Sequence, residues 1–589
     1  MQGEIDKQAE YWSQAAIFDG DTKSEILGLL ENGDRKELEE RFYKDLEFGT
    51  GGLRGVVGAG TSRMNLYNVR RASYAFGLYL TSYFKEEPVK VAISYDSRHF
   101  SKEFAHEAAR VLAAMSVRVY LTAELRPVPM LSFMVRHFGC HGGICVTASH
   151  NPPEYSGYKV YWQTGGQIVP PHDKAIISEY QRIKGFEDIP LMGFLEGVDK
   201  GLISLEGESL DEPYFEAVCG LKMRDAGKND LKIVYTPIHG AGAYPVPEAL
   251  KRFGFKHVQL VAEQEKPDGD FPTVSSPNPE SPAALEMAVA QASASKAHLV
   301  LGTDPDVDRI GVVVFSDGKP VYLNGNQLGS LLVDYVLSSW QQKGLLPKNP
   351  LVVKTIVTTN LQRKIAAHYG AHCDDTLTGF KWICQLIEDY QSGRLQPKRQ
   401  YVCGGEESYG FLAADFVRDK DAVIACCIAA EMTAYYLDQG KTLLDALDDL
   451  YRRHGCYDEI LETATLPGKA GQEKIAQMME SLRESPPDAI DGIHVQSIKD
   501  YQNSQEYARS GHSFEPKATI PLPASNVLQF TLADATKVSI RPSGTEPKIK
   551  FYVSSFGEVT PNASLEDIKR ECRSRSRRVA NAFVAMTKM

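Results

Sequence analysis

The stretch of sequence that decides the fold begins with VKVAISYD at residues 89–96 and SKEFAHEAARVLAAM at 101–115. VRVYLT (117–122), VPMLSFMVRHF (128–138) and GICVTAS (143–149) follow it. The first, third and fifth pieces are short and mostly apolar, as buried strands are, whereas the second has apolar residues at helical spacing. Those apolar residues are Phe104, Ala108, Val111, Leu112 and Met115. The stretch therefore predicts an α/β unit in which strands alternate with helices.

The same alternation returns twice further along the chain. It runs from Leu231 through LKIVYTP, KHVQLVAE and HLVLGTD, which ends at Asp304. It returns from a helix expected over 326–342 to the strand QYVCGGEES at 400–408. The three units recur about every 110 to 130 residues, which is the size of a domain and not of a solenoid repeat.

The last part of the chain has a different pattern. Strands are expected at HVQSI (494–498), NVLQFTL (526–532), KVSIRPS (537–543) and IKFYVSS (549–555), with a final helix from about Ser564. Strands in a run, followed by a helix, predict a smaller α+β domain with an antiparallel sheet. A chain of 589 residues is several times the length of one domain, so three or four domains are expected.

Composition narrows the class of protein. The chain is 43% hydrophobic and 24% charged, which is typical of a globular protein. Its 76 acidic and 65 basic residues give a net charge of -11, which argues against nucleic acid or an anionic membrane as a partner. The ten cysteines form no CxxC pair, so neither a disulfide framework nor a zinc site is expected. Because the apolar runs are short and no leader is visible, we expect a cytoplasmic protein.

The first loop of interest is TASHNPP at residues 147–153, which follows a predicted strand. In open α/β sheets, ligands bind beyond the carboxyl ends of strands. Ser149 is expected to be exposed on a stiff turn, and His150 and Lys159 can supply cationic or proton-transfer groups. The alternative interpretation is a helix or turn cap. A serine among cationic groups suits a site that holds an anion, which here would be a phosphoserine.

The second loop, GTDPDVDR at residues 302–309, ends a hydrophobic strand with Asp304, Asp306 and Asp308. Hard oxygen ligands in a tight loop suit Mg²⁺, and three carboxylates that converge without a cation would repel one another. An EF-hand calcium loop is disfavoured, because Arg309 stands where its glycine belongs. That arginine can instead grip a phosphate near the metal.

Two further loops offer groups for a sugar and a phosphate. GGEESYG (404–410) provides Glu406 and Ser408, which can hydrogen-bond sugar hydroxyls. RPSGTEPK (541–548) provides Arg541, two hydroxyls and glycine-freed backbone N–H groups, which suit a phosphate. Each loop taken alone is also compatible with ordinary turn chemistry.

One glycine-rich segment predicts structure rather than chemistry. GAGAYP (240–245) is similar to a dinucleotide-binding loop, but Pro245 stands at the position of the third glycine. Since proline is favoured in the first turn of a helix, we expect a helix-opening turn there. No Walker A motif is present, which argues against a nucleotide kinase.

The four loops together resemble the motifs of the α-D-phosphohexomutase family, the phosphoglucomutases and phosphomannomutases. FGTGGLRG, SYDSR, RPVP and LTGFK resemble further stretches of that family, and the chain is most similar to its larger phosphoglucomutase/phosphopentomutase branch. The resemblance implies a heart-shaped, four-domain protein with three related α/β domains with mixed sheets and a TATA-binding-protein-like α+β fourth domain. The domains are expected at 1–208, 209–323, 324–455 and 456–589.

The resemblance also implies roles for individual residues. Ser149 would carry the phosphoryl group, and Asp304, Asp306 and Asp308 would bind Mg²⁺ together with a phosphoserine oxygen. Arg54 and Arg309 would steady the phosphate, and His150 and Lys159 would transfer protons. The residues implied to bind the sugar or its phosphate are Thr378, Gly379, Glu406, Ser408 and Lys420. Those implied to hold the phosphate that is not reacting are Arg541, Ser543, Gly544 and Thr545.

The implied activity is that of a phosphoglucomutase, which interconverts α-D-glucose 1-phosphate and glucose 6-phosphate through a glucose 1,6-bisphosphate intermediate. Phosphopentomutase and phosphomannomutase activity by the same mechanism are alternatives, and a Mg²⁺-dependent sugar phosphatase or a non-catalytic sugar-phosphate binder are alternatives of other classes. The expected partners are small-molecule sugar phosphates, with no nucleic acid and no membrane, and the protein is expected to be a monomer or a homodimer.

Overall fold

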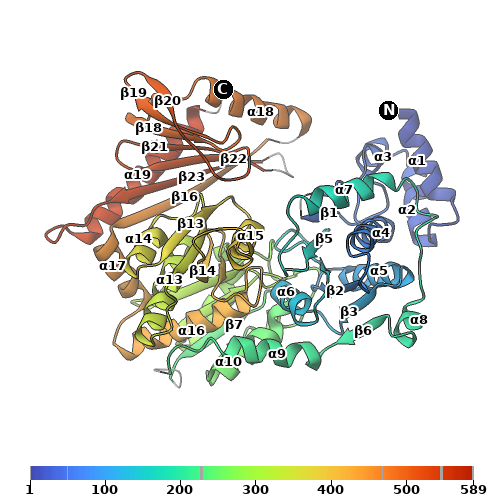
Figure 1. Ribbon diagram of the computed structural model, residues 1–589, viewed down its shortest axis with the longest axis horizontal. Helices are drawn as coiled ribbons and strands as arrows, with labels where there is room; N and C mark the ends of the chain where they lie inside the picture. The colour runs from blue at the N-terminus through green and yellow to red at the C-terminus, as the bar shows by residue number, and fades with distance from the viewer. Residues whose placement is uncertain (1, 50, 226–229, 467, 544–547, 587–589) are drawn as a thin grey trace. The chain divides into compact units, whose positions relative to one another are not determined.

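The computed structural model describes residues 2–49, 51–225, 230–466, 468–543 and 548–586 (Figure 1). The chain divides into two compact units. The first unit comprises Met1–Gly325, Cys384–Lys398 and Ser408–Asp438, and the second comprises Asn326–Ile383, Arg399–Glu407 and Gln439–Met589. None of the described helices is long and apolar enough to cross a membrane.

The first unit begins with three helices packed around aromatic side chains. These are α1 (Gln2–Gln14), α2 (Gly20–Glu31) and α3 (Arg35–Phe42). The ring of Trp12 is fully buried and stacks on Phe18 with 4.4 Å between the ring centroids. Tyr67 and Phe186, from the domain that follows, contact the same tryptophan edge-on. Aromatic packing therefore joins these helices to the first α/β domain.

A six-stranded sheet forms the core of that domain, in the order β1-β5-β4-β2-β3-β6. Its strands are β1 (Gly52–Val56), β2 (Lys90–Tyr95), β3 (Arg118–Thr122), β4 (Gly142–Val146), β5 (Tyr155–Trp162) and β6 (Ile203–Glu206). β2 pairs in parallel with β3 and β4, whereas β5 is antiparallel to β4 and β1. The predicted mixed α/β sheet is confirmed.

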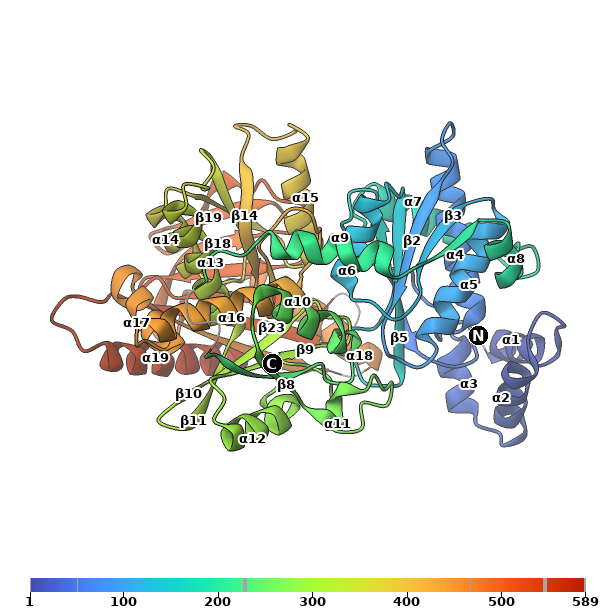
Figure 2. The ribbon, with the colours of Figure 1, turned by 90° about the horizontal axis from the view of Figure 1, so that it is seen from below.

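Helices cover both faces of this sheet, with α4 and α5 on one face and α6 on the other (Figure 2). The helices are α4 (Leu66–Tyr83), α5 (Ser101–Ala114), α6 (Val128–His137), α7 (His172–Arg182), α8 (Phe194–Asp199) and α9 (Glu208–Cys219). The apolar positions predicted on α5, such as Phe104 and Leu112, are buried against the sheet. The helical spacing in the sequence thus identified the buried face of α5.

The second sheet of the first unit has the order β11-β10-β9-β7-β8. Its strands are β7 (Lys232–Thr236), β8 (His257–Leu260), β9 (Leu299–Thr303), β10 (Ile310–Ser316) and β11 (Lys319–Leu323). The helices that accompany it are α10 (Pro245–Phe253), α11 (Ala262–Glu265), α12 (Glu286–Ser295) and α16 (Ala422–Asp438), and β15 (Gly410–Leu412) belongs to the same unit. Pro245 is the first residue of α10, so the helix-opening turn expected at GAGAYP is confirmed.

The second unit contains a parallel sheet in which β12 (Pro350–Thr355) pairs with β13 (His372–Thr376) and with β14 (Gln400–Glu406). Its helices are α13 (Gly325–Gln342), α14 (Leu361–His368) and α17 (Leu443–His454), and α15 (Phe380–Gln391) contributes residues to both units. β12 ends at Thr355, because the chain turns there. That turn places polar residues at the carboxyl end of β12.

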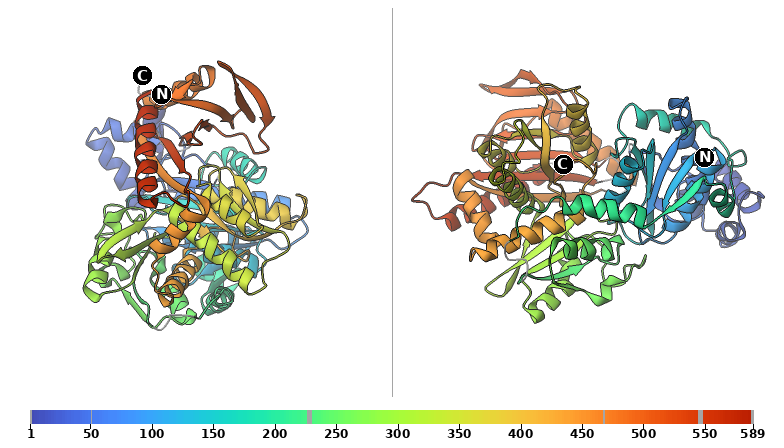
Figure 3. Two further views of the ribbon diagram at one scale, coloured as in Figure 1. Left: turned by 90° about the vertical axis from the view of Figure 1, so that its left-hand side faces the viewer. Right: turned by 60° about the horizontal axis from the view of Figure 1, so that its bottom comes forward.

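An eight-stranded antiparallel sheet follows, and α19 runs along one of its faces (Figure 3). Its long strands are β16 (Cys456–Thr465), β18 (Ile493–Asp500), β21 (Leu528–Leu532), β22 (Lys537–Pro542) and β23 (Lys548–Gly557). The remaining elements are α18 (Gly468–Glu484), β17 (Ala489–Ile490), β19 (Gln505–Ser510), β20 (Ser513–Thr519) and α19 (Leu565–Met586). The predicted C-terminal α+β domain with an antiparallel sheet is confirmed, whereas the domain boundaries stay a prediction.

Candidate active site

The loop that carries Ser149 connects β4 to β5. The backbone of Ser149 is left-handed, with φ of 52°, and its N–H donates to the Oγ1 of Thr147 at 2.8 Å. A non-glycine residue in this conformation is uncommon, and the surrounding contacts must hold it there. The expected stiff turn is present, but the expected exposure of Ser149 is wrong, since the residue is only 4% exposed. Its burial follows from the hydrogen bonds that its hydroxyl makes inside the site.

Arg98 stabilises this loop by hydrogen bonds to its backbone. The sequence did not predict this residue as part of the site. Its guanidinium donates to the carbonyl oxygens of Ser149 at 2.6 Å, Pro152 at 2.8 Å and Tyr155 at 3.0 Å, and also to that of Asn151. The side chain is fully buried. Burial lowers the pKa of Arg98 although Asp96 favours its charge. The resemblance of the SYDSR stretch to the family pointed to this region. The sequence alone could not show that the arginine of this stretch binds backbone carbonyls.

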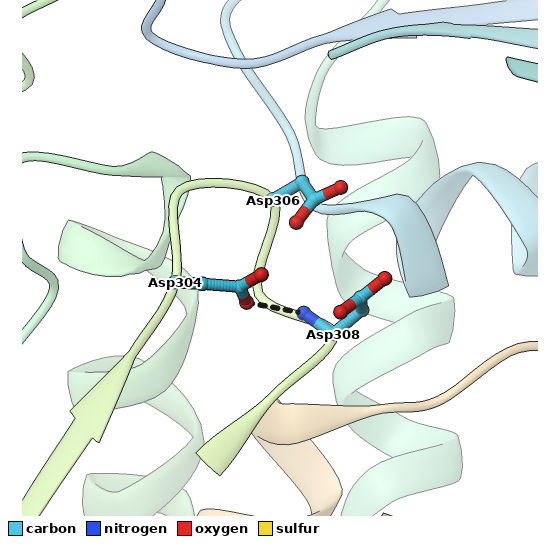
Figure 4. A group of neighbouring side chains, drawn as sticks. All are labelled: Asp304, Asp306 and Asp308. Atoms are coloured by element: carbon cyan, nitrogen blue, oxygen red, sulfur yellow. Dashed lines mark hydrogen bonds between the residues drawn. The ribbon is translucent and has the colours of Figure 1, made fainter. Parts of the chain in front are cut away.

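Three aspartates form the acidic centre of the site (Figure 4). Asp304 follows β9 directly, and its Oδ1 accepts the backbone N–H groups of Asp308 at 3.1 Å and Arg309 at 3.0 Å. Ligand oxygens of Asp304, Asp306 and Asp308 lie within 4.8 Å of one another, and all three residues are buried. The alternating spacing in the sequence thus places three carboxylates around one point, as predicted.

The acidic centre lies against the Ser149 loop. The Ser149 hydroxyl donates to Asp304 Oδ2 at 2.8 Å, and Thr147 donates to Asp306 Oδ2 at 3.2 Å. From the neighbouring strand β5, the ammonium of Lys159 donates to Asp306 at 2.8 Å and to Asp308 at 3.4 Å. Ser149, Lys159 and all three predicted aspartate ligands therefore belong to one connected network.

Lys420 also belongs to this network. Its ammonium lies 3.2 Å from Asp308 Oδ2 and 3.1 Å from Asp419 Oδ1. Asp419 in turn accepts a hydrogen bond of 2.8 Å from the buried hydroxyl of Tyr161. The stem of Lys420 passes over Gly410, where a Cβ atom would lie 2.1 Å from its Cδ. A glycine is therefore needed at the start of β15 for the lysine to reach the acidic centre.

The surrounding charges shift the pKa values of the aspartates in different directions. Burial, and then Asp306 and Asp308, raise the pKa of Asp304 well above its ordinary value. Burial also acts to raise the pKa of Asp308, but Lys420, Lys159 and Arg309 together outweigh it and lower that pKa. For Lys159, burial disfavours the charged form, yet Asp306 and Asp308 raise its pKa. Opposite charges thus stabilise each other where water is excluded.

The donor set of the acidic centre fits a hard divalent cation. The Oδ1 atoms of Asp306 and Asp308 are buried and have no hydrogen-bond partner among the described residues. Buried carboxylate oxygens without a partner are costly, and a bound cation would satisfy them. Oxygen-only ligands in a short loop favour Mg²⁺ or a similar ion over zinc or copper.

His150 and two predicted arginines interact with or within the Ser149 loop. The Nδ1 of His150 lies 3.2 Å from the Ser149 hydroxyl. Arg309, then burial and Arg54, lower the pKa of His150 well below its ordinary value. Arg54 is exposed and donates to the Asn151 side chain at 3.3 Å. Gly52, with φ of 129°, lets β1 approach β5 so closely that a Cβ there would lie 1.8 Å from the Tyr158 carbonyl oxygen.

The predicted sugar-binding residues fall in two parts of the chain. In the second unit, Glu406 Oε1 accepts the backbone N–H of Gly379 at 2.8 Å, which joins GGEESYG to the LTGFK stretch that contains Thr378. Gly379 has φ of 108°, a conformation that favours glycine. Ser408 begins the next segment of the first unit. The structure therefore brings Glu406 and Gly379 together.

Arg541 is the next-to-last residue of β22 in the second unit, and Ser543 donates its backbone N–H to the Lys548 carbonyl at 2.8 Å. Gly544 and Thr545 lie outside the described residues. The buried Tyr552 interacts electrostatically with Arg541 and with the glutamates of GGEESYG. Burial and then Glu407 raise the pKa of Tyr552, while Arg541 acts in the opposite direction.

Comparison with known proteins gives the family. The sequence matches three domains described as Phosphoglucomutase/phosphomannomutase, alpha/beta/alpha: domain I at residues 45–186, domain II at 212–317 and domain III at 324–454. The phosphoglucomutase of Staphylococcus haemolyticus is 35% identical over 88% of this chain and 91% of its own length. The chain belongs to the phosphoglucomutase/phosphomannomutase family. The family resemblance inferred from the four motifs is confirmed, and with it the class of enzyme, a phosphohexomutase isomerase.

Other members of the family agree in sequence or fold. The phosphoglucomutase of Staphylococcus aureus strain MRSA252 is 36% identical over 88% of this chain and 91% of its own length. Solved structures that share the fold include parafusin, a phosphoglucomutase from Paramecium, at a TM-score of 0.64 and 17% identity over 92% of this chain and 95% of that one. A phosphoglucomutase/phosphomannomutase family protein from Burkholderia thailandensis has a TM-score of 0.62 and 18% identity, covering 91% and 98% of the two chains.

Proposed function

We propose that this protein is a phosphoglucomutase that interconverts α-D-glucose 1-phosphate and glucose 6-phosphate through a phosphorylated Ser149. The contact that carries the proposal is the 2.8 Å hydrogen bond from the Ser149 hydroxyl to Asp304, inside the network of acidic and cationic side chains. A serine so placed can hold a phosphoryl group between the carboxylate centre and Lys159. The names of the relatives at 35 to 36% identity support glucose phosphates as substrates.

The proposed reaction exchanges phosphoryl groups between Ser149 and the sugar. A free hydroxyl of the sugar phosphate attacks the phosphoserine phosphorus and loses its proton, the bond from phosphorus to Ser149 Oγ breaks, and Ser149 Oγ takes up a proton. The product is glucose 1,6-bisphosphate. In the second half, Ser149 Oγ loses its proton and attacks the other phosphate of the bisphosphate, the bond from that phosphorus to the sugar oxygen breaks, and the sugar oxygen takes up a proton. Atoms and charge balance over the cycle, and no net hydrolysis occurs.

The cation held by the acidic centre and the arginines beside it would neutralise charge during that exchange. Asp304, Asp306 and Asp308 would hold Mg²⁺, which would offset the negative charge of the transferred phosphoryl group. Arg309 and Arg54 would bind phosphoryl oxygens, because a guanidinium provides several N–H donors in a fixed plane. Lys159 and His150, both close to Ser149 or its carboxylate partners, would supply and accept the protons.

The remaining residues would bind the parts of the sugar phosphate that do not react. Glu406, Ser408, Lys420, Thr378 and Gly379 would contact the sugar hydroxyls or its phosphate. The loop of Arg541, Ser543, Gly544 and Thr545 would hold the second phosphate. This division matches the chemistry, since the bisphosphate must be gripped at one end while the other end reacts.

The assay that tests this function uses purified protein with Mg²⁺, trace glucose 1,6-bisphosphate and a panel of sugar 1-phosphates. Formation of glucose 6-phosphate from glucose 1-phosphate, faster than any reaction of mannose, ribose or deoxyribose 1-phosphate, is the expected result. Preference for a pentose 1-phosphate would identify a phosphopentomutase instead. Release of free phosphate at the rate of substrate loss would identify a phosphatase.

A further inference from the structure

Arg309 has a carboxylate partner that none of the four motifs contains. Its Nη1 forms a close ion pair with Oε1 of Glu280, and both side chains are mostly buried. On the other side of the guanidinium, Nε lies 3.8 Å from Asp308 Oδ1. Arg309 therefore stands between Glu280 and the acidic centre, and two carboxylates can compete for it.

The position of Glu280 is fixed by the turn around it. Its backbone N–H donates to the Asn278 side chain at 3.1 Å. The preceding Pro279 packs on β10, where a Cβ atom on Gly311 would lie 2.7 Å from the Pro279 carbonyl oxygen. Four residues before Glu280, the Ser276 hydroxyl donates to the carbonyl of His150 at 3.2 Å. The same turn thus contacts the Ser149 loop and Arg309, and it sets the distance between them.

We propose that Glu280 is a positioning residue, which holds the Arg309 guanidinium beside the acidic centre so that this arginine can contact the phosphoryl group on Ser149. This inference rests on the proposed function. An arginine without Glu280 would be drawn to the unsatisfied Oδ1 of Asp308, an oxygen that the cation needs. Fixing the guanidinium beforehand also removes the cost of reorienting it during phosphoryl transfer.

Two consequences distinguish this role from a contribution to folding alone. First, Glu280→Gln should weaken Mg²⁺ binding, because Arg309 then competes with the cation for Asp308. Second, it should lower kcat by about 10- to 100-fold while changing KM little, since the interaction lost is one made in the transition state. Glu280→Asp, which keeps the charge on a shorter side chain, should recover part of both losses.

A double-mutant cycle with Arg309→Ala tests whether Glu280 acts through Arg309. We would measure kcat, KM and calorimetric Mg²⁺ affinity for Glu280→Gln, Arg309→Ala and the double variant. The double variant should match Arg309→Ala in kcat, because the positioned group is already missing. Additive losses in kcat, or unchanged Mg²⁺ affinity in Glu280→Gln, would overturn the inference.

Glu212→Gln is the matched control. Glu212 forms a bidentate pair with Arg252 in the same unit, at 2.6 and 2.8 Å, and neither residue pairs with a described residue of the site. The kcat and Mg²⁺ affinity of Glu212→Gln should equal those of the unmodified protein, and its thermal stability should resemble that of Glu280→Gln.

Absence of mutase turnover in the unmodified protein would overturn the proposed function instead. The same cycle would then be measured on hydrolysis of phosphorylated Ser149, in which water attacks phosphorus and the serine oxygen leaves with a proton.

Discussion

At the scale of single residues, the site contains buried side chains of opposite charge, and the exclusion of water strengthens the interactions between them. Asp308 contacts two ammonium groups, those of Lys159 and Lys420, and stays ionised because both favour its charge. Among the described residues Asp304 pairs with neither ammonium group, and it accepts two backbone N–H groups and the Ser149 hydroxyl instead. Two aspartates four residues apart therefore differ in their surroundings, and Asp304 is the one that contacts the serine.

Ser149 is predicted to be the residue that carries the phosphoryl group. Incubation with glucose 1,6-bisphosphate should add one phosphate to the protein by intact-mass analysis, and Ser149→Ala should abolish that addition together with mutase turnover. Ser94→Ala is a suitable control, since Ser94 is another buried serine of the same domain, on β2. Undiminished turnover in Ser149→Ala would show that the phosphoryl group is carried elsewhere.

Asp308 is predicted to bind the cation and also to compensate the positive charges of Lys159 and Lys420. Asp308→Asn should lower kcat by more than ~10-fold and weaken Mg²⁺ affinity, because a neutral amide is a poorer ligand and leaves Lys159 and Lys420 less compensated. Calorimetric titration with Mg²⁺ measures the second effect directly. Asp173→Asn, at a buried aspartate at the start of α7, should change neither quantity. Full activity of Asp308→Asn in the presence of EDTA would contradict the metal site.

At the scale of elements, the carboxyl ends of strands place the functional loops. Ser149 follows β4, Asp304 follows β9, and Glu407 follows β14. In the second unit, the end of β12 supports the end of β14. The hydroxyls of Thr355 and Thr358 each donate to Glu407 Oε2 at 2.9 Å, and Glu407 is adjacent to the proposed sugar ligand Glu406. Two parallel strands thereby fix one loop.

Thr358→Val should therefore disturb sugar binding without removing any group that contacts the sugar. The substitution deletes the hydrogen bond to Glu407 at nearly constant volume, which costs roughly 1 to 3 kcal/mol, and we expect KM for glucose 1-phosphate to rise about 10-fold. Steady-state kinetics would measure KM and kcat separately. Thr433→Val, at a buried threonine of α16, is the control. An unchanged KM would mean that Glu407 does not set the position of this loop.

At the scale of the whole molecule, local patterns could be predicted and long-range partners could not. The aspartates of GTDPDVDR were identified because their spacing within five residues is enough to bring them together. Arg98 was missed because its partners are backbone carbonyls more than fifty residues away, and Glu280 because 29 residues separate it from Arg309. The last two strands along the C-terminal sheet, β19 and β20, were missed because their residues are mostly polar and partly or fully exposed, without an apolar strand pattern.

The residues proposed to transfer the phosphoryl group and those proposed to hold the other phosphate belong to different units of the chain. The last prediction depends on that separation. Ser149 and the three aspartates belong to the first unit, whereas Arg541 belongs to the second.

If Arg541 holds the phosphate that does not react, Arg541→Ala should raise KM by roughly 10- to 150-fold, the equivalent of about 1.5 to 3 kcal/mol. Hydrolysis of phosphorylated Ser149 by water should hardly change, because the chemical groups are intact. A bisphosphate held at one end only should also escape, so glucose 1,6-bisphosphate should accumulate in quenched reactions of this variant. Arg483→Ala, which removes an ion pair with Asp500 in the same C-terminal domain, should show neither effect. An unchanged KM without leakage would place the phosphate grip at other residues.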